Sequence, residues 1–456
     1  MSHFFKVKTL EQVLSLVPEF PAVGIEKVHL SMAYSRVLAQ DIDADQNLPG
    51  FRRATMDGYA VHSGSTFGAS ESNPAWLTVE GSILMGELPD FSIEPGQTAK
   101  ISTGGMLPDG ADSVVMVEHT ESVNSGAVKY GKAVEDDGAV DIISRLESVE
   151  RGTVEIYKSV APLQNVIDID EDFKKGDKIL KSGTLIRPQE VGLVAALGIC
   201  ELSVYKIPKV GIISTGDEVV SIEETPPLLG KIRDMNSYTL AGLIVEAGAQ
   251  PVHYGIVKDN EEALYEACSK AIAETDMVLV SGGSSVGTRD FTVKVLSSLK
   301  DTQIMVHGIS ISPGKPTILA RYGLDEYGRF KPVWGLPGHV VSAMVVFKIV
   351  VLPFLQQIKG LTFCGVNRSS IFSIPARLTR NVASAQGRRD FIRVKLARKC
   401  EINSKDRYQI FAEPILGKSG LIRTMIIADG LLEIGENVEG LEKGEMVDII
   451  ALRAFN

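Results

Sequence analysis

Acidic residues follow three apolar runs in the middle of the chain, at the points where strands would end. Asp217 follows VGIIST, Asp259 follows VHYGIV, and Asp290 closes the glycine-rich stretch VSGGSSVGTRD. The segment GKIRDMNS adds Asp234 between the first two runs. Because parallel strands present their carboxyl ends at one edge of a sheet, where ligands of open α/β sheets bind, we expect these acids to converge.

A cluster of this kind favours a bound cation. Two carboxylates about 4 Å apart repel by roughly 4 kcal/mol at an effective dielectric near 20. Hard oxygen ligands suit magnesium, which proteins usually share with substrate phosphates. The structural alternative, in which each acid caps a helix or closes a turn, is the stronger one for any single acid. For the whole set of strand ends we favour a ligand site.

The loop VSGGSSVGTRD favours an anion. It has neither the Gly-Lys-Ser/Thr of a P-loop nor the G-x-G-x-x-G of a dinucleotide site. Its glycines allow close backbone approach, and N–H groups at a helix start bind anions. Lys315 lies in the stiff Pro-Gly-Lys-Pro turn of ISISPGKPTILA, and Ser342 follows the turn of GLPGHVVSA. A solvated surface lysine is the alternative for Lys315.

Signals for other chemistry are weaker. FRRATMDGYAV places Asp57 in a glycine-containing turn, and ISTGGMLPDGADSVVMVEHTE has a similar glycine-rich entry to a strand, but each alone is more often structural. The seven histidines show no metal-ligand spacing, and no Ser-His-Asp or Cys-His arrangement supports acyl transfer. None of the four cysteines forms a C-x-x-C, which argues against a zinc site.

The elements that must position these residues form an α/β centre between β-rich parts. From Lys209, strand runs alternate with helices of about 12 residues, which predicts a parallel sheet with right-handed crossovers. Short β-rich runs over 76–168 and after 359 predict two small all-β domains. Helical spacing also predicts helices over 31–39 and 189–197.

Composition limits the partners and the compartment. A net charge of −10 without a long basic run argues against nucleic acid. The scattered thiols fit a reducing compartment, and the start MSHFFKVKTLEQ lacks the apolar core of a signal peptide. The apolar run Val340–Leu355 contains Lys348 and Pro353 and predicts a buried helix. We expect a cytoplasmic protein that does not bind membranes.

In this order, nine motifs closely resemble those of the molybdopterin molybdenumtransferases, the MoeA/gephyrin E-domain family. They are ATMDGYAV, STGGMLPDGADSVVMVE, RPQEVGLVAALG, VGIISTGDEV, IRDMNS, VSGGSSVGTRD, SPGKP, GLPG and QGRRDFIR. The resemblance implies a multidomain α/β plus β fold, with a central doubly wound, MogA-like α/β domain, a β-rich insertion domain and a C-terminal β-barrel-like domain. The implied boundaries are 1–45 with 156–187 for an N-terminal subdomain, 46–155 for the insertion, 188–358 for the molybdopterin-binding domain, and 359–456 for the C-terminal domain.

The same resemblance implies a reaction and an assembly. Molybdate is inserted into adenylylated molybdopterin with help from magnesium, AMP is released, and the molybdenum cofactor forms. The partners implied are the pterin, the oxyanion, a second copy in a homodimer and the enzyme that adenylylates molybdopterin. The active site of such a dimer combines the sheet and C-terminal domains of one chain with the β-rich insertion of the other.

Matching positions carry the implied roles. Catalytic roles fall on Asp57, Thr103, Glu190 and Lys315. Magnesium ligands fall on Asp172, Glu190, Asp217 and Asp259. Substrate contacts fall on Gly216, Asp217, Asp234, Ser281, Gly282, Gly283, Ser285, Gly287, Asp290, Pro316, Ser342, Arg388, Arg393 and Ser419. Cleaving a phosphoanhydride beside an oxyanion calls for such cations and hydroxyls next to a magnesium-loaded acidic cluster.

Several departures from the family pattern lie around the implied oxyanion pocket. GLPGHV has His339 and Val340 where the family usually has Asn-Pro, and SPGKP has Ser312 where it usually has Lys. His339 would act as a neutral donor or as a pH-sensitive cation, and Arg423 would restore the lost charge. The fold prediction is unaffected, whereas the choice between molybdate and tungstate stays open.

Three functions therefore remain to be compared. A molybdenum insertase, or a tungstate-specific one, is favoured by the presence of Asp57, Lys315 and Ser342. A divergent, non-catalytic carrier or scaffold is favoured by the altered turns, although the chain has no added linkers or fused domain. Nucleotidyl transfer onto molybdopterin would use the same glycine loop but leaves the other domains without a role.

Overall fold

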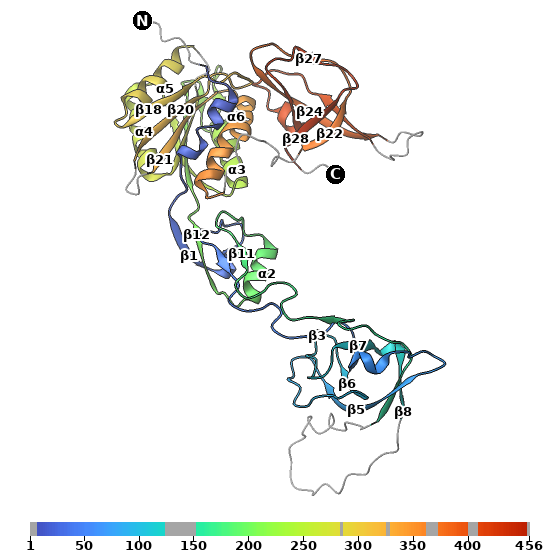
Figure 1. Cartoon of the computed structure of the whole chain (residues 1–456). Coiled ribbons are helices and arrows are strands. Elements are labelled where there is room, and N and C mark those ends of the chain that lie inside the picture. Colours follow the sequence, from blue (N-terminus) through green and yellow to red (C-terminus); the bar gives the residue numbers. More distant parts are fainter. Residues whose placement is uncertain are drawn as a thin grey trace. The chain divides into compact units, whose positions relative to one another are not determined.

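The chain folds into two units, and the computed structural model describes residues 7–123, 152–282, 286–324, 329–361, 373–399 and 409–453. The first unit comprises Met1–Gln40, Ser182–Val191 and Cys200–Asn456, and the second comprises Asp41–Lys181 and Gly192–Ile199. Figure 1 shows their elements, and each unit is described by itself. The finer four-part division stays a prediction.

The first unit contains a six-stranded sheet in the order β16-β13-β17-β21-β20-β18. The strands are β16 (Gln250–Val257), β13 (Lys209–Thr215), β17 (Met277–Gly282), β21 (Phe330–Leu336), β20 (Ile318–Leu324) and β18 (Thr302–His307). Five of these strands run in the same direction, and β20 runs opposite to them. Strand β13 is buried from Val210 to Thr215, as expected for a strand covered on both faces. The predicted parallel sheet is confirmed.

Helices cover both faces of this sheet (Figure 1), so the doubly wound prediction is confirmed. One face is covered by α1 (Leu10–Leu14), α3 (Asn236–Glu246), α6 (Val340–Val346) and α7 (Leu352–Ile358), and the other by α4 (Glu261–Glu274) and α5 (Val286–Ser298). The chain passes from β13 through α3 to β16, then crosses through α4 to β17 on the other side of β13. The carboxyl ends of β13 and β17 therefore form a topological switch point, where such sheets bind ligands.

A π-helical turn, Phe347–Val351, joins α6 to α7. The Leu352 N–H donates to the Phe347 carbonyl, one residue further back than in an α-helix. The next residue, Pro353, has no N–H and would clash with the preceding α-helical turn, so the wider turn accommodates it. The segment Val340–Ile358 is long and apolar enough to cross a membrane. However, 67% of its apolar 18-residue stretch is buried inside the protein. The predicted buried helix is confirmed.

A closed five-stranded barrel forms the C-terminal part of the first unit. Its strands are β24 (Arg389–Lys399), β25 (Gln409–Pro414), β22 (Ser373–Leu378), β28 (Met446–Ala451) and β26 (Gly430–Ile434), and β26 closes on β24. Strand β19 (Ile311–Ser312) leaves the loop before β20 and pairs with β24 at Arg389 and Asp390. This pairing fixes the SPGKP loop against the barrel.

The second unit contains another six-stranded sheet, in the order β7-β4-β6-β5-β9-β8. The strands are β7 (Ser113–Met116), β4 (Gly58–Val61), β6 (Gln97–Ile101), β5 (Ala75–Ile83), β9 (Thr153–Ile156) and β8 (Thr120–Val123). Two short strand pairs flank this sheet in sequence. They are β2 (Ile42–Asp43) with β11 (Lys178–Leu180) and β3 (Arg53–Ala54) with β10 (Val166–Ile167). The β-rich prediction for this region is confirmed.

One predicted helix is wrong. Residues 31–39 contain only a 3₁₀ turn, Leu30–Met32, which ends before Ser35 adopts a φ of 64°. The Leu38 N–H then donates to Thr184 and the Ala39 N–H to Ser203, so strand-like pairing replaces helical bonds. Nearby, β1 (Ile25–His29) pairs with β12 (Glu201–Tyr205). The helix predicted over 189–197 is confirmed as α2 (Pro188–Ala196).

The remaining elements are short and lie outside the main sheets. They are the pairs β14 (Val219–Val220) with β15 (Ile232–Arg233) and β23 (Val382–Ala383) with β27 (Gly440–Leu441), the helix α8 (Arg423–Ile426), and the 3₁₀ turns Val17–Glu19, Ser63–Thr66 and Val117–His119. The pair β14–β15 follows directly on the end of β13, so it borders the switch point.

Candidate functional site

A cavity of about 180 Å³ lies at the switch point; we call it the crevice. It is lined by the ends of β13 and β17 and by the start of α3, with Thr215, Gly282 and Asp234 among its residues. A Cβ added to Gly282 would lie 2.0 Å from Thr215 Oγ1, so only glycine allows the two strand ends to approach this closely. The glycine loop begins here. Its predicted residues Gly283 and Ser285 lie outside the described residues. Gly287 and Asp290 lie in the first turns of α5, where the side chains of 286–290 are likewise outside the described part.

Asp234 and Asn236 organise the crevice. The buried Asp234 carboxylate accepts hydrogen bonds from the N–H and hydroxyl of Ser237, so it holds the first turn of α3, as the structural alternative requires. Asn236 Nδ2 donates to Ser281 Oγ over 2.7 Å and to the Gly338 carbonyl over 2.9 Å, which ties the start of α3 to the end of β17 and to the loop before α6. Sequence reasoning missed Asn236, although it lies in the IRDMNS motif two residues after Asp234.

Asp217 and Asp259 lie side by side at the strand ends. The Asp259 N–H donates to Asp217 Oδ1 over 3.3 Å. Burial raises the pKa of Asp259, and the neighbouring Asp217 and Glu218 charges raise it further. The Lys231 ammonium is bound to the carbonyl of Asp217 rather than to its carboxylate. This local excess of negative charge fits a bound cation such as magnesium.

The other two predicted magnesium ligands, Glu190 and Asp172, come from other segments of the chain. Glu190, on α2, accepts hydrogen bonds from the N–H and guanidinium of Arg187, and the Arg187 side chain is the main reason that its pKa is lowered. Asp172 belongs to the second unit. Within the described part of the chain, no three His, Cys, Asp or Glu side chains gather closely enough to hold a metal ion by themselves. A cation at Asp217 and Asp259 would complete its coordination with oxygens from water, backbone carbonyls or a substrate.

A larger cavity of about 660 Å³ lies between the sheet and the barrel of the first unit; we call it the loop pocket. The SPGKP loop forms one wall, and the start of α6 and the entry to β24 form the others. Its predicted residues are Ser312, Lys315, Pro316, Ser342, Arg388 and Ser419, and His339 lines both this pocket and the crevice. Arg388 Nε lies 3.1 Å from Asp390 Oδ1, so the pocket combines a partly neutralised arginine with an exposed lysine.

Arg393 lines an adjoining cavity of about 260 Å³, the Arg393 pocket, which shares Ser312 and Ser419 with the loop pocket. Arg393 is only 6% exposed, and burial lowers the pKa of its guanidinium. One nitrogen, Nη2, donates to the Gly417 carbonyl over 2.8 Å, while the buried Nε has no acceptor within the described part of the chain. No carboxylate pairs with Arg393 among the ion pairs of the described residues. A buried cation without a carboxylate partner is costly, and an anionic ligand would neutralise it and accept from Nε.

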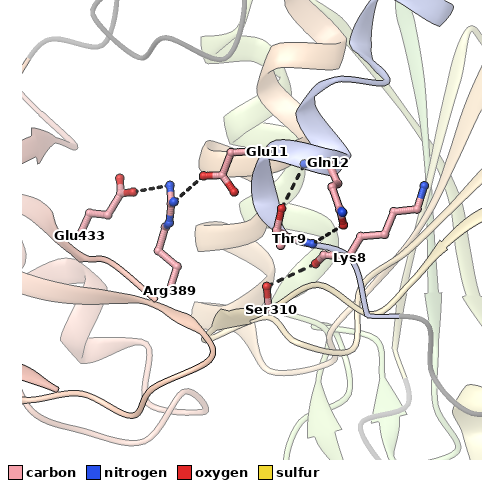
Figure 2. Close-up of polar contacts among 7 residues, drawn as sticks. All are labelled: Lys8, Thr9, Glu11, Gln12, Ser310, Arg389 and Glu433. Carbon is pink, nitrogen blue, oxygen red and sulfur yellow. Dashed lines mark hydrogen bonds and ion pairs between the residues drawn. The ribbon is translucent and has the colours of Figure 1, made fainter. Parts of the chain in front are cut away.

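The N-terminal segment contacts the loop that lines the loop pocket. The Ser310 N–H donates to the Lys8 carbonyl, and the Arg389 N–H donates to the Ser310 carbonyl, each over 2.9 Å. The Ser310 hydroxyl also donates to the Lys8 carbonyl over 3.4 Å, as Figure 2 shows. The Arg389 guanidinium is bound between Glu11 of α1 and Glu433 of β26. Burial works against ionised Glu11, but its backbone hydrogen bond and Arg389 leave its pKa lowered. We call these contacts the N-terminal clasp.

Asp57 and Thr103 pair in the second unit. Asp57 Oδ1 accepts hydrogen bonds from the Thr103 N–H over 2.6 Å and from the Thr103 hydroxyl over 2.9 Å, and these bonds lower the pKa of this exposed carboxyl. A Cβ on the next residue, Gly58, would lie 1.9 Å from the Val115 carbonyl oxygen, so this strand start requires glycine. The turn therefore presents an ionised carboxylate at the surface of the β-rich unit.

Three family models match the chain in sequence order. The MoeA N-terminal region (domain I and II) matches residues 7–198, the "Probable molybdopterin binding domain" matches 211–357, and the MoeA C-terminal region (domain IV) matches 375–452. A molybdopterin biosynthesis protein of Methanocaldococcus jannaschii is 38% identical over 437 residues, covering 94% of this chain and 92% of that protein. The chain belongs to the MoeA family.

Other relatives agree in sequence and in structure. A molybdopterin molybdenumtransferase of Haemophilus influenzae is 33% identical over 84% of this chain and 85% of that protein. A crystal structure of a molybdopterin biosynthesis MoeA protein from Pyrococcus horikoshii superposes with a TM-score of 0.73 at 34% identity, covering 99% of this chain and 100% of that one. Because three further relatives, including the Haemophilus influenzae protein, are named molybdopterin molybdenumtransferase, this family member is an enzyme of the transferase class.

Proposed function

We propose that this chain is a molybdenum insertase, which transfers molybdate into adenylylated molybdopterin and releases AMP. The observation that carries the proposal is the buried Arg393 guanidinium, which has no carboxylate partner among the described residues and lines the same cavity as Ser419. Fixed donors in a site of low dielectric stabilise an oxyanion strongly because they need not reorganise. Lys315 and Arg388 add positive charge in the adjoining loop pocket.

The crevice would hold the pterin substrate. Its polar lining from Thr215, Asn236 and Ser281 suits the polar edges of a pterin, and its place at the switch point suits a phosphate-bearing ligand. Magnesium would be held by Asp217 and Asp259 together with substrate phosphate oxygens, and it would neutralise charge at the phosphoanhydride. His339, which lines both cavities, joins the pterin side to the oxyanion side.

Asp57 is proposed to complete the site from a second copy of the chain. Large apolar side chains are exposed beside it, since Met56 is 43% and Met85 69% exposed, and a Cβ on Gly104 would touch Met85. Exposed apolar groups next to a functional carboxylate are typical of a surface that another protein covers. A homodimer would cover them, and a cytoplasmic location and a transient partner that supplies adenylylated molybdopterin fit the same reading.

Single-turnover conversion of adenylylated molybdopterin with magnesium tests this function. We expect AMP release that depends on molybdate or on tungstate, with metal–pterin formation in the same turnover. Asp57→Asn should lower the rate at least about 100-fold, within the range for a positioned catalytic carboxylate. Tight pterin binding without AMP release under either oxyanion would contradict the proposal and favour the carrier or scaffold.

A further inference from the structure

His339 and Ser419 lie where the three cavities meet. His339 lines the crevice and the loop pocket, and Ser419 lines the loop pocket and the Arg393 pocket. Their side chains are in contact, with 2.9 Å between His339 Nδ1 and Ser419 Oγ. The serine backbone is fixed separately, because the Val341 N–H of α6 donates to its carbonyl over 3.1 Å. The imidazole therefore controls mainly where the hydroxyl hydrogen of Ser419 points.

A serine hydroxyl has one hydrogen, so only one partner can receive it. When His339 Nδ1 carries no hydrogen, the hydroxyl donates to the imidazole and offers the pocket only lone pairs, which repel an oxyanion. When Nδ1 carries a hydrogen, it donates to Ser419 Oγ, and the hydroxyl hydrogen is free to reach an oxyanion. The imidazolium always has that hydrogen, whereas neutral imidazole has it in only one tautomer.

We propose that His339 is a positioning residue that turns the Ser419 hydroxyl toward a bound oxyanion when Nδ1 is protonated. The inference rests on the proposed function, because it takes the loop pocket and the Arg393 pocket as the oxyanion site. By linkage, binding a dianion favours the imidazolium, so molybdate binding takes up protons near neutral pH. Affinity then falls as rising pH removes the imidazole proton.

Charged groups of both signs line the two cavities that His339 borders. The loop pocket contributes the cations Lys315 and Arg388, and the crevice contributes Glu218, Arg233 and Asp234. The cations disfavour an imidazolium in the free pocket, and the two acids favour it. A bound dianion offsets the cations, so oxyanion binding and protonation of His339 favour each other.

Equilibrium binding of molybdate alone tests the inference, by calorimetry at pH 6, 7 and 8 in buffers of different ionisation enthalpy. For the unsubstituted protein we expect proton uptake and an affinity about three- to tenfold lower at pH 8 than at pH 6, the range of one hydrogen bond. His339→Asn places an amide N–H near the Nδ1 position at every pH, so it should bind without proton uptake and with constant affinity. His253→Asn, on the edge strand β16, is the matched control and should keep the original profile.

Two further measurements separate positioning from folding. Proton–nitrogen NMR should show Nδ1 of His339 gaining a hydrogen when molybdate is added, with the signal assigned by its loss in H339N. Ser419→Ala should weaken binding at pH 6 and flatten the profile. A folded H339N protein whose affinity still falls with pH would overturn the inference and leave the proposed function standing. No molybdate binding by the unsubstituted protein at any pH would overturn both.

Discussion

The strand ends beside the crevice and the Arg393 pocket carry opposite charges. In the crevice region, Asp259 has a raised pKa because it is partly buried beside Asp217 and Glu218. In the Arg393 pocket, a buried guanidinium has a lowered pKa and no carboxylate partner among the described residues. Each arrangement costs stability in the free protein, so each is best explained by a ligand of the opposite sign.

The largest effect is expected from removing the Arg393 guanidinium. Arg393→Met should weaken molybdate binding about 100-fold, because charge-assisted hydrogen bonds in a site of low dielectric are lost. The free energy of unfolding should stay the same or rise by up to about 1 kcal/mol, since methionine fills the space without a buried charge. Calorimetry and urea unfolding measure the two quantities. Equal binding, or a marked loss of stability, would show that Arg393 is structural and would end the comparison.

Removing the Asp259 carboxylate should change how the free energy of unfolding depends on magnesium. The raised pKa of Asp259 means that its ionised form destabilises the fold, and that this cost is present above its folded pKa and disappears at lower pH. Asp259→Asn should therefore raise the free energy of unfolding at pH 7 by up to about 1 kcal/mol without magnesium. Added magnesium should stabilise this variant less than the unsubstituted protein, as measured by urea unfolding. A variant that is less stable without magnesium would contradict this account of the crevice.

The smallest effect is expected at the N-terminal clasp. The lowered pKa of Glu11 means that its contribution to stability is present above the unfolded pKa and is lost as pH falls through the folded value. Glu11→Gln should lower the free energy of unfolding at pH 7 by about 0.5 kcal/mol, with the difference vanishing in acid. Molybdate affinity should fall by less than about threefold through the loop that Arg389 anchors.

A matched control for the clasp is Glu261→Gln, which breaks the exposed pair with Lys294 in the same unit. It should cost similar stability and leave molybdate affinity unchanged. If both substitutions changed binding equally, the clasp would have no special relation to the loop pocket.

Much of the fold could be predicted from local patterns. Apolar runs of strand length alternating with helical segments fixed the α/β centre, and Lys348 with Pro353 separated a buried helix from a membrane span. The segment 31–39 has helical spacing, but its N–H groups pair with residues near 184 and 203, so tertiary pairing overrode local pattern. Strand β19, two residues long, could not be predicted because only its contact with β24 makes it a strand.

Sequence patterns could name candidate residues for the site but not their hydrogen-bond or ion-pair partners. Strand ends placed Asp217 and Asp259 at one edge, and the structure has them adjacent. Residue types alone could not show that Asp234 holds Ser237, or that Arg393 lacks a carboxylate. The contact between His339 and Ser419 joins residues 80 positions apart, and no spacing rule connects them.

The most direct test of the oxyanion site is an anomalous difference map from crystals grown with molybdate, recorded at the molybdenum absorption edge. The account predicts one strong peak within hydrogen-bonding distance of Arg393 and Ser419, absent in crystals of Arg393→Met. A molybdenum peak away from both side chains, or the same peak in the Met variant, would contradict it.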